Sequence, residues 1–102
     1  MSYEIRSNGD TSVIRLDGRF VFTSHTGFRE TYERVLARSE TRVIQLDMDK
    51  VEYLDSSALG MMLLLKDKSE AMGKNIQIRR ATGVARQVLE VANFHKIFDM
   101  TP

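Results

Sequence analysis

Short apolar stretches separated by turn-forming residues open the chain. Residues 3–7 and 12–16 each have the length and composition of a β-strand, and Asn8-Gly9-Asp10 between them supplies a turn. Asp17-Gly18 follows the second stretch and is expected to end it. This pattern predicts a β-hairpin at the start of the domain.

Helical spacing begins in the next segment. Between Thr26 and Arg38 apolar side chains recur at i, i+4, i+7 and i+8, which places them in one stripe of an amphipathic helix. Thr23 or Ser24 is placed to cap this predicted helix. The members of the stripe are Phe28, Tyr32, Val35 and Leu36.

Strand and helix patterns alternate through the rest of the chain. Residues 42–48 form a β-branched apolar run suited to a central strand buried on both faces. Residues 55–72 favour a helix that Gly73 ends, and residues 75–79 alternate with the period of a strand. Thr82 can cap a third helix. The predicted buried face of that helix, and the apolar patch after it, consist of Val84, Val88, Leu89, Val91, Ala92, Phe94, Ile97 and Phe98.

This order of elements predicts the α/β fold class. The crossover helices imply parallel pairing of the later strands, whereas the hairpin gives the sheet an antiparallel start. The chain has 102 residues, which is enough for one core but not comfortably for two. We therefore expect one domain over residues 1–102, a mixed β-sheet with helices packed on it.

The composition excludes several classes of function. Hydrophobic residues make up 42% of the chain and charged residues 28%, and the net charge of +1 gives no reason to expect binding to nucleic acid or to an anionic membrane. No cysteine is present, which excludes disulfides and thiol catalysis. The N-terminus lacks an apolar secretion signal, and the longest apolar run, residues 58–65, is too short to insert into a bilayer. We expect a soluble cytoplasmic protein.

Residue patterns typical of enzymes are missing. The chain has no Gly-rich phosphate loop, Ser-His-Asp set or paired acids. His25 and His95 are far apart in sequence and lack acidic companions, which argues against a metal site. We therefore expect a protein that is not an enzyme and needs no cofactor or metal.

The most informative segment is Asp55-Ser56-Ser57, which lies just before the strongly apolar second helix. Each of these short polar side chains could accept a hydrogen bond from the free amides of the first helical turn, and a plain helix cap is the simplest interpretation. Helix starts also favour negative charge, and in open α/β sheets partners bind at the carboxyl ends of strands. A phosphoryl group on a serine is therefore compatible with this position.

Residues 51–60, Val-Glu-Tyr-Leu-Asp-Ser-Ser-Ala-Leu-Gly, resemble the motif of the STAS domain when taken with the preceding strand Val-Ile-Gln-Leu-Asp at 43–47. The likeness is greatest to single-domain bacterial anti-sigma factor antagonists and extends over essentially the whole chain. Residues 16–20 match the early strand that ends in Gly, residues 73–75 match the turn before the late strand, and residues 84–98 match the last helix and its Phe-x-x-Ile-Phe patch.

The resemblance implies a partner-switching signal-transduction protein that regulates transcription. In the antagonist family the first Ser of the motif, here Ser56, is phosphorylated by a serine kinase that is often the anti-sigma factor itself, and a serine phosphatase reverses the reaction. The unmodified form binds the anti-sigma factor and thereby frees the sigma factor, whereas the phosphorylated form releases its partner. We expect the protein to be a monomer or a weak homodimer.

The resemblance also assigns roles within the motif. Asp55 is expected to hold the loop and orient the Ser56 hydroxyl or a kinase-bound metal. Ser57 is expected to cap the helix, with a role as second phosphoacceptor left open. Ala58 stands where many relatives have Gly, and Gly60 is expected to let the first turn pack closely on a neighbour.

Two further groups of residues are candidates for partner binding. Met61 and Met62 lie in an apolar helix, and either they are covered by neighbouring structure or they form an adaptable docking patch beside Ser56. The acid that many relatives carry near the position of Val21 is absent. Thr23, Ser24 and His25 are therefore the candidates for the second part of the interface.

Two other functions stay open at this point. One is an accessory STAS subunit of a membrane transporter, similar to those that support the ATPase of lipid-trafficking systems, in which the same helix docks a permanent partner without phosphorylation. The other is a nucleotide-binding module whose phosphate is received by the loop at Ser56.

Overall fold

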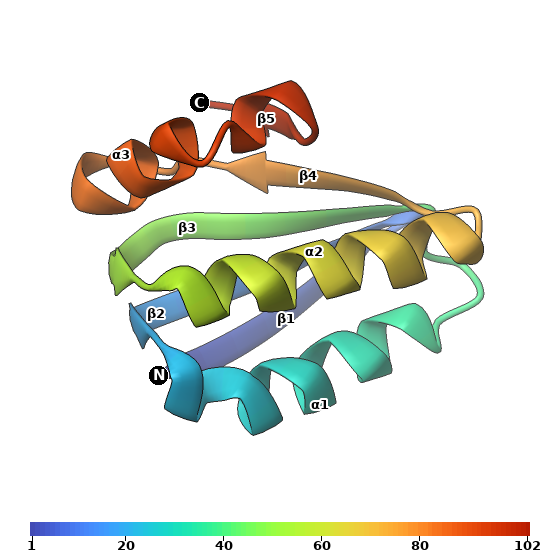
Figure 1. Ribbon diagram of the computed structural model, residues 1–102. Helices are drawn as coiled ribbons and strands as arrows, with labels where there is room; N and C mark the ends of the chain where they lie inside the picture. The colour runs from blue at the N-terminus through green and yellow to red at the C-terminus, as the bar shows by residue number, and fades with distance from the viewer.

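The computed structural model describes all residues, 1–102, and places five strands in one sheet in the order β1-β2-β3-β4-β5 (Figure 1). The first two strands are antiparallel, and every later neighbouring pair is parallel. This arrangement confirms the predicted mixed sheet and α/β class. The strands are β1 (Ser2–Asn8), β2 (Thr11–Phe20), β3 (Val43–Leu54), β4 (Asn75–Arg79) and β5 (Asp99–Thr101).

Two of the three helices lie side by side across one face of the sheet (Figure 1). These are α1 (His25–Leu36) and α2 (Ser56–Ala71), and Gly73, at φ +71°, follows α2 as predicted. The third, α3 (Gly83–Val91), continues from the end of β4 and packs beside the carboxyl-terminal half of β3 (Figure 1). Two short 3-10 turns, η1 (Phe22–Ser24) and η2 (Phe94–Lys96), complete the chain. None of the helices combines the length and apolar character needed to cross a membrane.

The hydrophobic core fills the space between the sheet and the helices. Alternate side chains of β2 and β3 point into it, so that Ile14 and Leu46 are fully buried. Phe28 of α1 contacts the rings of Phe20 and Tyr32, at centroid distances of 4.8 and 5.3 Å. The stripe predicted for α1 is therefore confirmed as its buried face.

The two central strands are longer than predicted. The expected ends were Leu16 and Met48, but β2 and β3 remain paired in parallel as far as Phe20 and Leu54. Asp17-Gly18 does not end β2. Gly18 adopts φ +115° inside the strand, and the register with β3 shifts before and after it, so the strand continues through an irregularity instead of stopping at a turn. The short strand β5 was not predicted at all.

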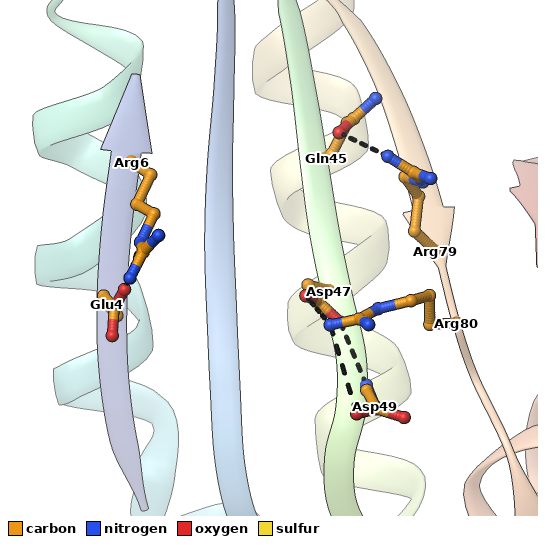
Figure 2. A network of polar contacts seen from close by, with 7 residues as sticks. All are labelled: Glu4, Arg6, Gln45, Asp47, Asp49, Arg79 and Arg80. Atoms are coloured by element: carbon orange, nitrogen blue, oxygen red, sulfur yellow. Dashed lines mark hydrogen bonds and ion pairs between the residues drawn. The ribbon is translucent and has the colours of Figure 1, made fainter. Parts of the chain in front are cut away.

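The expectation that β3 is buried on both faces is wrong. Its first six residues alternate between half-buried and buried, and the half-buried ones, Gln45 and Asp47 among them, line a face that carries no helix (Figure 2). Charged and amide side chains pair across this open face. Gln45 Nε2 donates a hydrogen bond to Gln77 Oε1 at 2.9 Å. Arg80 donates to both carboxylate oxygens of Asp47, at 3.1 and 2.6 Å (Figure 2).

The predicted buried face of α3 is also partly wrong. Ala85 and Leu89 face the core, Val88 is half-buried, and Ala92 is exposed. Val84 is 48% exposed and Val91 84% exposed. The helix lies beside an edge of β3 rather than across the sheet, so only a narrow arc of its apolar surface is covered. In the patch that follows, Phe94 and Phe98 are buried and Ile97 is exposed, at 49%.

Asp47 makes the stability of the open face dependent on pH. Partial burial raises the pKa of its carboxyl group, but the hydrogen bonds and charge of Arg80, the Asp49 amide and the charge of Arg15 outweigh this, and the net pKa lies below the ordinary value. Because the folded-state pKa is depressed, this contribution to stability is present above the unfolded-state pKa of about 3.9. It is lost as the pH falls through the lower folded-state value.

We therefore predict that Asp47→Asn flattens the loss of stability in acid. The free energy of unfolding, measured by urea denaturation at a series of pH values, should fall more steeply below about pH 4 in the unsubstituted protein than in Asp47→Asn. Asp67→Asn, at an exposed acid of α2 that makes no ion pair, is the control and should leave the slope unchanged. Identical slopes for the unsubstituted protein and Asp47→Asn would contradict this account.

A close contact fixes the first strand to α1. The Tyr3 hydroxyl donates to the Ser24 carbonyl oxygen at 3.0 Å, and a Cβ atom added at Gly27 would lie 2.9 Å from Tyr3 Cε2. By contrast, a Cβ at Gly60 would meet nothing within 4 Å. The two helical glycines therefore occupy opposite environments.

We predict opposite effects of alanine at these two positions. Gly27→Ala should displace the Tyr3 ring and lower the free energy of unfolding by about 1 kcal/mol. Gly60→Ala should raise it by about 0.5–1 kcal/mol, because only helix propensity changes there. Chemical denaturation of both variants measures the free energy of unfolding. Equal changes of the same sign would show that the Tyr3 ring does not need the space left by the missing side chain of Gly27.

Candidate functional site at the start of α2

Asp55 connects the loops that leave the carboxyl ends of β2 and β3. It is the N-cap residue of α2, and its Oδ1 accepts a hydrogen bond from the Ala58 amide at 2.9 Å. Its Oδ2 accepts from the Phe22 amide of η1 at 3.2 Å, and its own amide donates to the Phe20 carbonyl oxygen at 3.2 Å. Asp55 thus holds its loop through direct hydrogen bonds to the start of α2, to η1 and to the end of β2, as predicted. Neither carboxylate oxygen accepts from the Ser56 hydroxyl.

The predicted capping role of Ser57 is wrong. Asp55 takes the N-cap position, so Ser56 and Ser57 are the first two helical residues. A hydroxyl at these positions points out from the first turn, and the amide that a cap would satisfy is already bonded to Asp55. Both serines are exposed, and neither hydroxyl has a hydrogen-bond partner within the chain.

The other candidates on α2 divide into buried and exposed groups. Ala58 is fully buried and Met62 belongs to the core, whereas Met61 is half-buried against it. The close packing expected at Gly60 is not found within the domain, since the position faces open space. Of the two alternatives for Met61 and Met62, the structure favours the one in which neighbouring elements cover them, and the exposed apolar side chains of the helix are Leu63 and Leu64.

Only part of the second candidate loop is accessible. Thr23 and His25 are exposed, and the His25 ring stacks on Phe22 with 5.4 Å between centroids. Ser24 is buried and offers little side-chain surface, so its place in an interface stays a prediction. Its hydroxyl accepts from the Val21 amide and donates to the Arg19 carbonyl oxygen, both at 3.2 Å, and therefore shapes the turn instead of capping α1.

A mostly apolar groove of about 520 Å³ runs from Ser56 to the end of α3. Six of its nine lining residues are hydrophobic. The first turns of α2, the end of β3 and the last turns of α3 contribute Tyr53, Leu54, Asp55, Ser56, Leu59, Gln87, Val88, Val91 and Ala92. The sequence assigned no binding role to Tyr53 or Val91. The repeat of valines at 84, 88 and 91, offset from Ala85 and Leu89, is the signal that could have indicated a second apolar face of α3.

Positive charge borders this groove. The Arg19 guanidinium lies over the Tyr53 ring, 4.8 Å from its centroid, and forms no ion pair. Residues 56–65 of α2 carry no charged side chain at all. Glu90 of α3 is paired with Arg86 at 2.8 Å, and the exposed Glu52 is unpaired. The lining residue Asp55 forms no ion pair, but its two carboxylate oxygens accept the backbone amides of Phe22 and Ala58.

A family model described as "Mlab, STAS domain" matches residues 3–102. The chain belongs to the STAS domain family. A STAS-domain containing protein of Pseudomonas aeruginosa (strain UCBPP-PA14) is 36% identical to it over 95 residues, which are 93% of this chain and 92% of that protein.

Solved structures of low sequence identity share the STAS fold seen here. An anti-sigma factor antagonist from Mycobacterium paratuberculosis is 19% identical with a TM-score of 0.83, and 99% of this chain and 85% of that chain are covered. The phosphorylated form of the Bacillus cell fate determinant SpoIIAA is 17% identical, with a TM-score of 0.74 and coverages of 99% and 92%. A sulfate transporter family protein from Wolinella succinogenes is 14% identical, with a TM-score of 0.76 and coverages of 90% and 76%.

The geometry predicts that Asp55 and Ser57 differ sharply in their contribution to stability. Asp55→Ala removes the acceptors of two backbone amides and should lower the free energy of unfolding by about 1–2 kcal/mol. Ser57→Ala removes a hydroxyl without partners and should change it by less than about 0.5 kcal/mol. Urea denaturation of both variants tests the assignment, which fails if Ser57→Ala costs as much as Asp55→Ala.

Proposed function

We propose that this STAS domain is a phosphorylation-switched interaction module, an anti-sigma factor antagonist whose phosphoacceptor is Ser56. The observation that carries the proposal is that Asp55, and not Ser56, caps α2. Asp55 satisfies the helix start, so the Ser56 hydroxyl is exposed and has no structural task. A serine left free at the carboxyl edge of the sheet is available to a kinase.

The position of Ser56 favours a phosphoryl group on the folded protein. It is the first residue of α2, where the partial positive charge of the helix and the free amides of the first turn stabilise an anion. A phosphate adds about −1.5 to −2 charges and three acceptor oxygens at pH 7. The modification therefore leaves the fold intact and changes the surface.

The surroundings of Ser56 explain why such a change would release a partner. An apolar groove lies on one side of it, and Phe22, 57% exposed, lies on the loop that Asp55 holds against the start of α2. A dianion in the middle of an apolar interface loses its hydration and repels facing acids. In this proposal the unmodified form binds an anti-sigma factor that is also a serine kinase, the phosphorylated form releases it, and a serine phosphatase restores binding. The likeness to antagonists, including a phosphorylated one, supports this function.

We predict that a cognate serine-kinase anti-sigma factor and ATP add one phosphoryl group to the protein. Intact-mass spectrometry should show the addition in the unsubstituted protein and in Ser57→Ala, and its absence in Ser56→Ala. Isothermal titration calorimetry should give equal affinities for the unsubstituted protein and Ser56→Ala, and an affinity at least about tenfold lower for Ser56→Asp. Undiminished labelling of Ser56→Ala would refute the site, and equal affinities of all three forms would refute the switch.

A second candidate is an accessory subunit of a membrane transporter. It is favoured by the matching model described as "Mlab, STAS domain" and by the same fold in a sulfate transporter family protein. In that role the start of α2 docks permanently on an ATP-binding cassette protein. Co-purification with such an ATPase, unchanged by Ser56→Asp, would support this function over the switch.

A further inference from the structure

We propose that the groove between α2 and α3 receives an amphipathic helix of the anti-sigma partner, with its apolar side on Val91 and a carboxylate on Arg19. The inference rests on the proposed function and adds to it the chemistry of the segment that is recognised. Three features of the groove carry it: its small number of free polar groups, the unpaired Arg19 at its rim and its position beside Ser56.

The polar groups of the groove suit a helix rather than an extended peptide. Of its nine lining residues, only Asp55, Ser56 and Gln87 are polar, and both Asp55 oxygens already accept backbone amides. An extended peptide would leave much of its backbone without hydrogen-bond partners in such a groove. A helix satisfies its own backbone and presents apolar side chains at i, i+3 or i+4, and i+7.

The charges at the rim select an acidic partner. Arg19 lies over Tyr53, which itself lines the groove, and the guanidinium has no acidic partner in the chain. Of the acids beside the groove, Glu90 of α3 is paired with Arg86, and the carboxylate of Asp55 accepts two backbone amides at the positive end of α2. An exposed arginine stacked on a tyrosine beside an apolar groove combines the residue types that dominate binding energy at interfaces.

The position of the groove links its occupant to the switch. Ser56 is one of the lining residues, so a helix seated in the groove contacts the hydroxyl that would be phosphorylated. A phosphate there would face the carboxylate side of the same helix and repel it. One acidic segment thus accounts for both the recognition by Arg19 and the release on phosphorylation.

The test is a selection from a random library of displayed peptides of about 16 residues on the immobilised, unmodified full chain. The enriched peptides should be amphipathic, with apolar residues at helical spacing and Asp or Glu at one end. Their affinities for the unsubstituted protein and for variants are then measured by fluorescence anisotropy, after circular dichroism has shown that each variant is folded.

Matched variants locate the binding surface. Val91→Ser should weaken binding at least about tenfold, whereas Val84→Ser, at an exposed valine on the same face of α3 but outside the groove, should leave it within about twofold. Arg19→Glu should weaken binding by a similar factor. Arg42→Glu, which changes the net charge equally at the opposite end of the sheet, should not.

Several outcomes would overturn the inference. These are a selection that enriches no family of peptides, enrichment of basic or uncharged peptides, and equal losses in Val84→Ser and Val91→Ser. Self-association of the chain that Val91→Ser abolishes, measured by sedimentation, would assign the groove to a second copy instead.

The groove and the switch can fail separately. Acidic peptides that bind the unsubstituted protein and Ser56→Asp equally would leave the groove assigned and refute the switch. Phosphorylation at Ser56 by a kinase, together with a selection that yields no acidic amphipathic peptides, would leave the switch standing and refute the groove.

Discussion

The contacts of one carboxylate, that of Asp55, determine the geometry of the site. One oxygen satisfies the start of α2 and the other holds the η1 turn after β2, so two loops that are far apart in sequence meet at a fixed distance. The same residue is tied to β2 through its amide. These bonds place Ser56 and Phe22, which come from different loops, on one surface.

This bridge depends on the parallel pairing of β2 with β3. Both strands must run the full distance to Phe20 and Leu54 for their following loops to lie side by side. The core residues on their inner face, with Phe28 of α1 and Met62 of α2, hold the helices against them. The site is therefore positioned by strands and helices that share the buried core of the domain.

The sequence predicted the elements that have a clear period and missed those that depend on tertiary context. The α1 stripe, the hairpin and the start of α2 followed from spacing and turn chemistry. Ser56 was singled out by its motif, and its exposure agrees with the proposed role. The assignment of the cap to Ser57 was wrong because several short polar side chains compete for one amide, and only coordinates show which reaches it. Val91 was placed in the core because apolar periodicity does not reveal how wide an arc of a helix its neighbours cover.

The irregular end of β3 has a consequence for how such domains diverge. Beyond Asp47 the strand contains two more residues than the stretch of β2 that it pairs with, and its buried positions change from 44, 46 and 48 to 51 and 54. The consecutive side chains of Glu52 and Tyr53 are therefore both exposed, two residues before the Asp55-Ser56 pair that follows Leu54. In a regular strand one of the two would be fixed by the core. Here both are free to vary, so mutation can change the surface beside the proposed phosphoacceptor without disturbing the packing that keeps the domain folded.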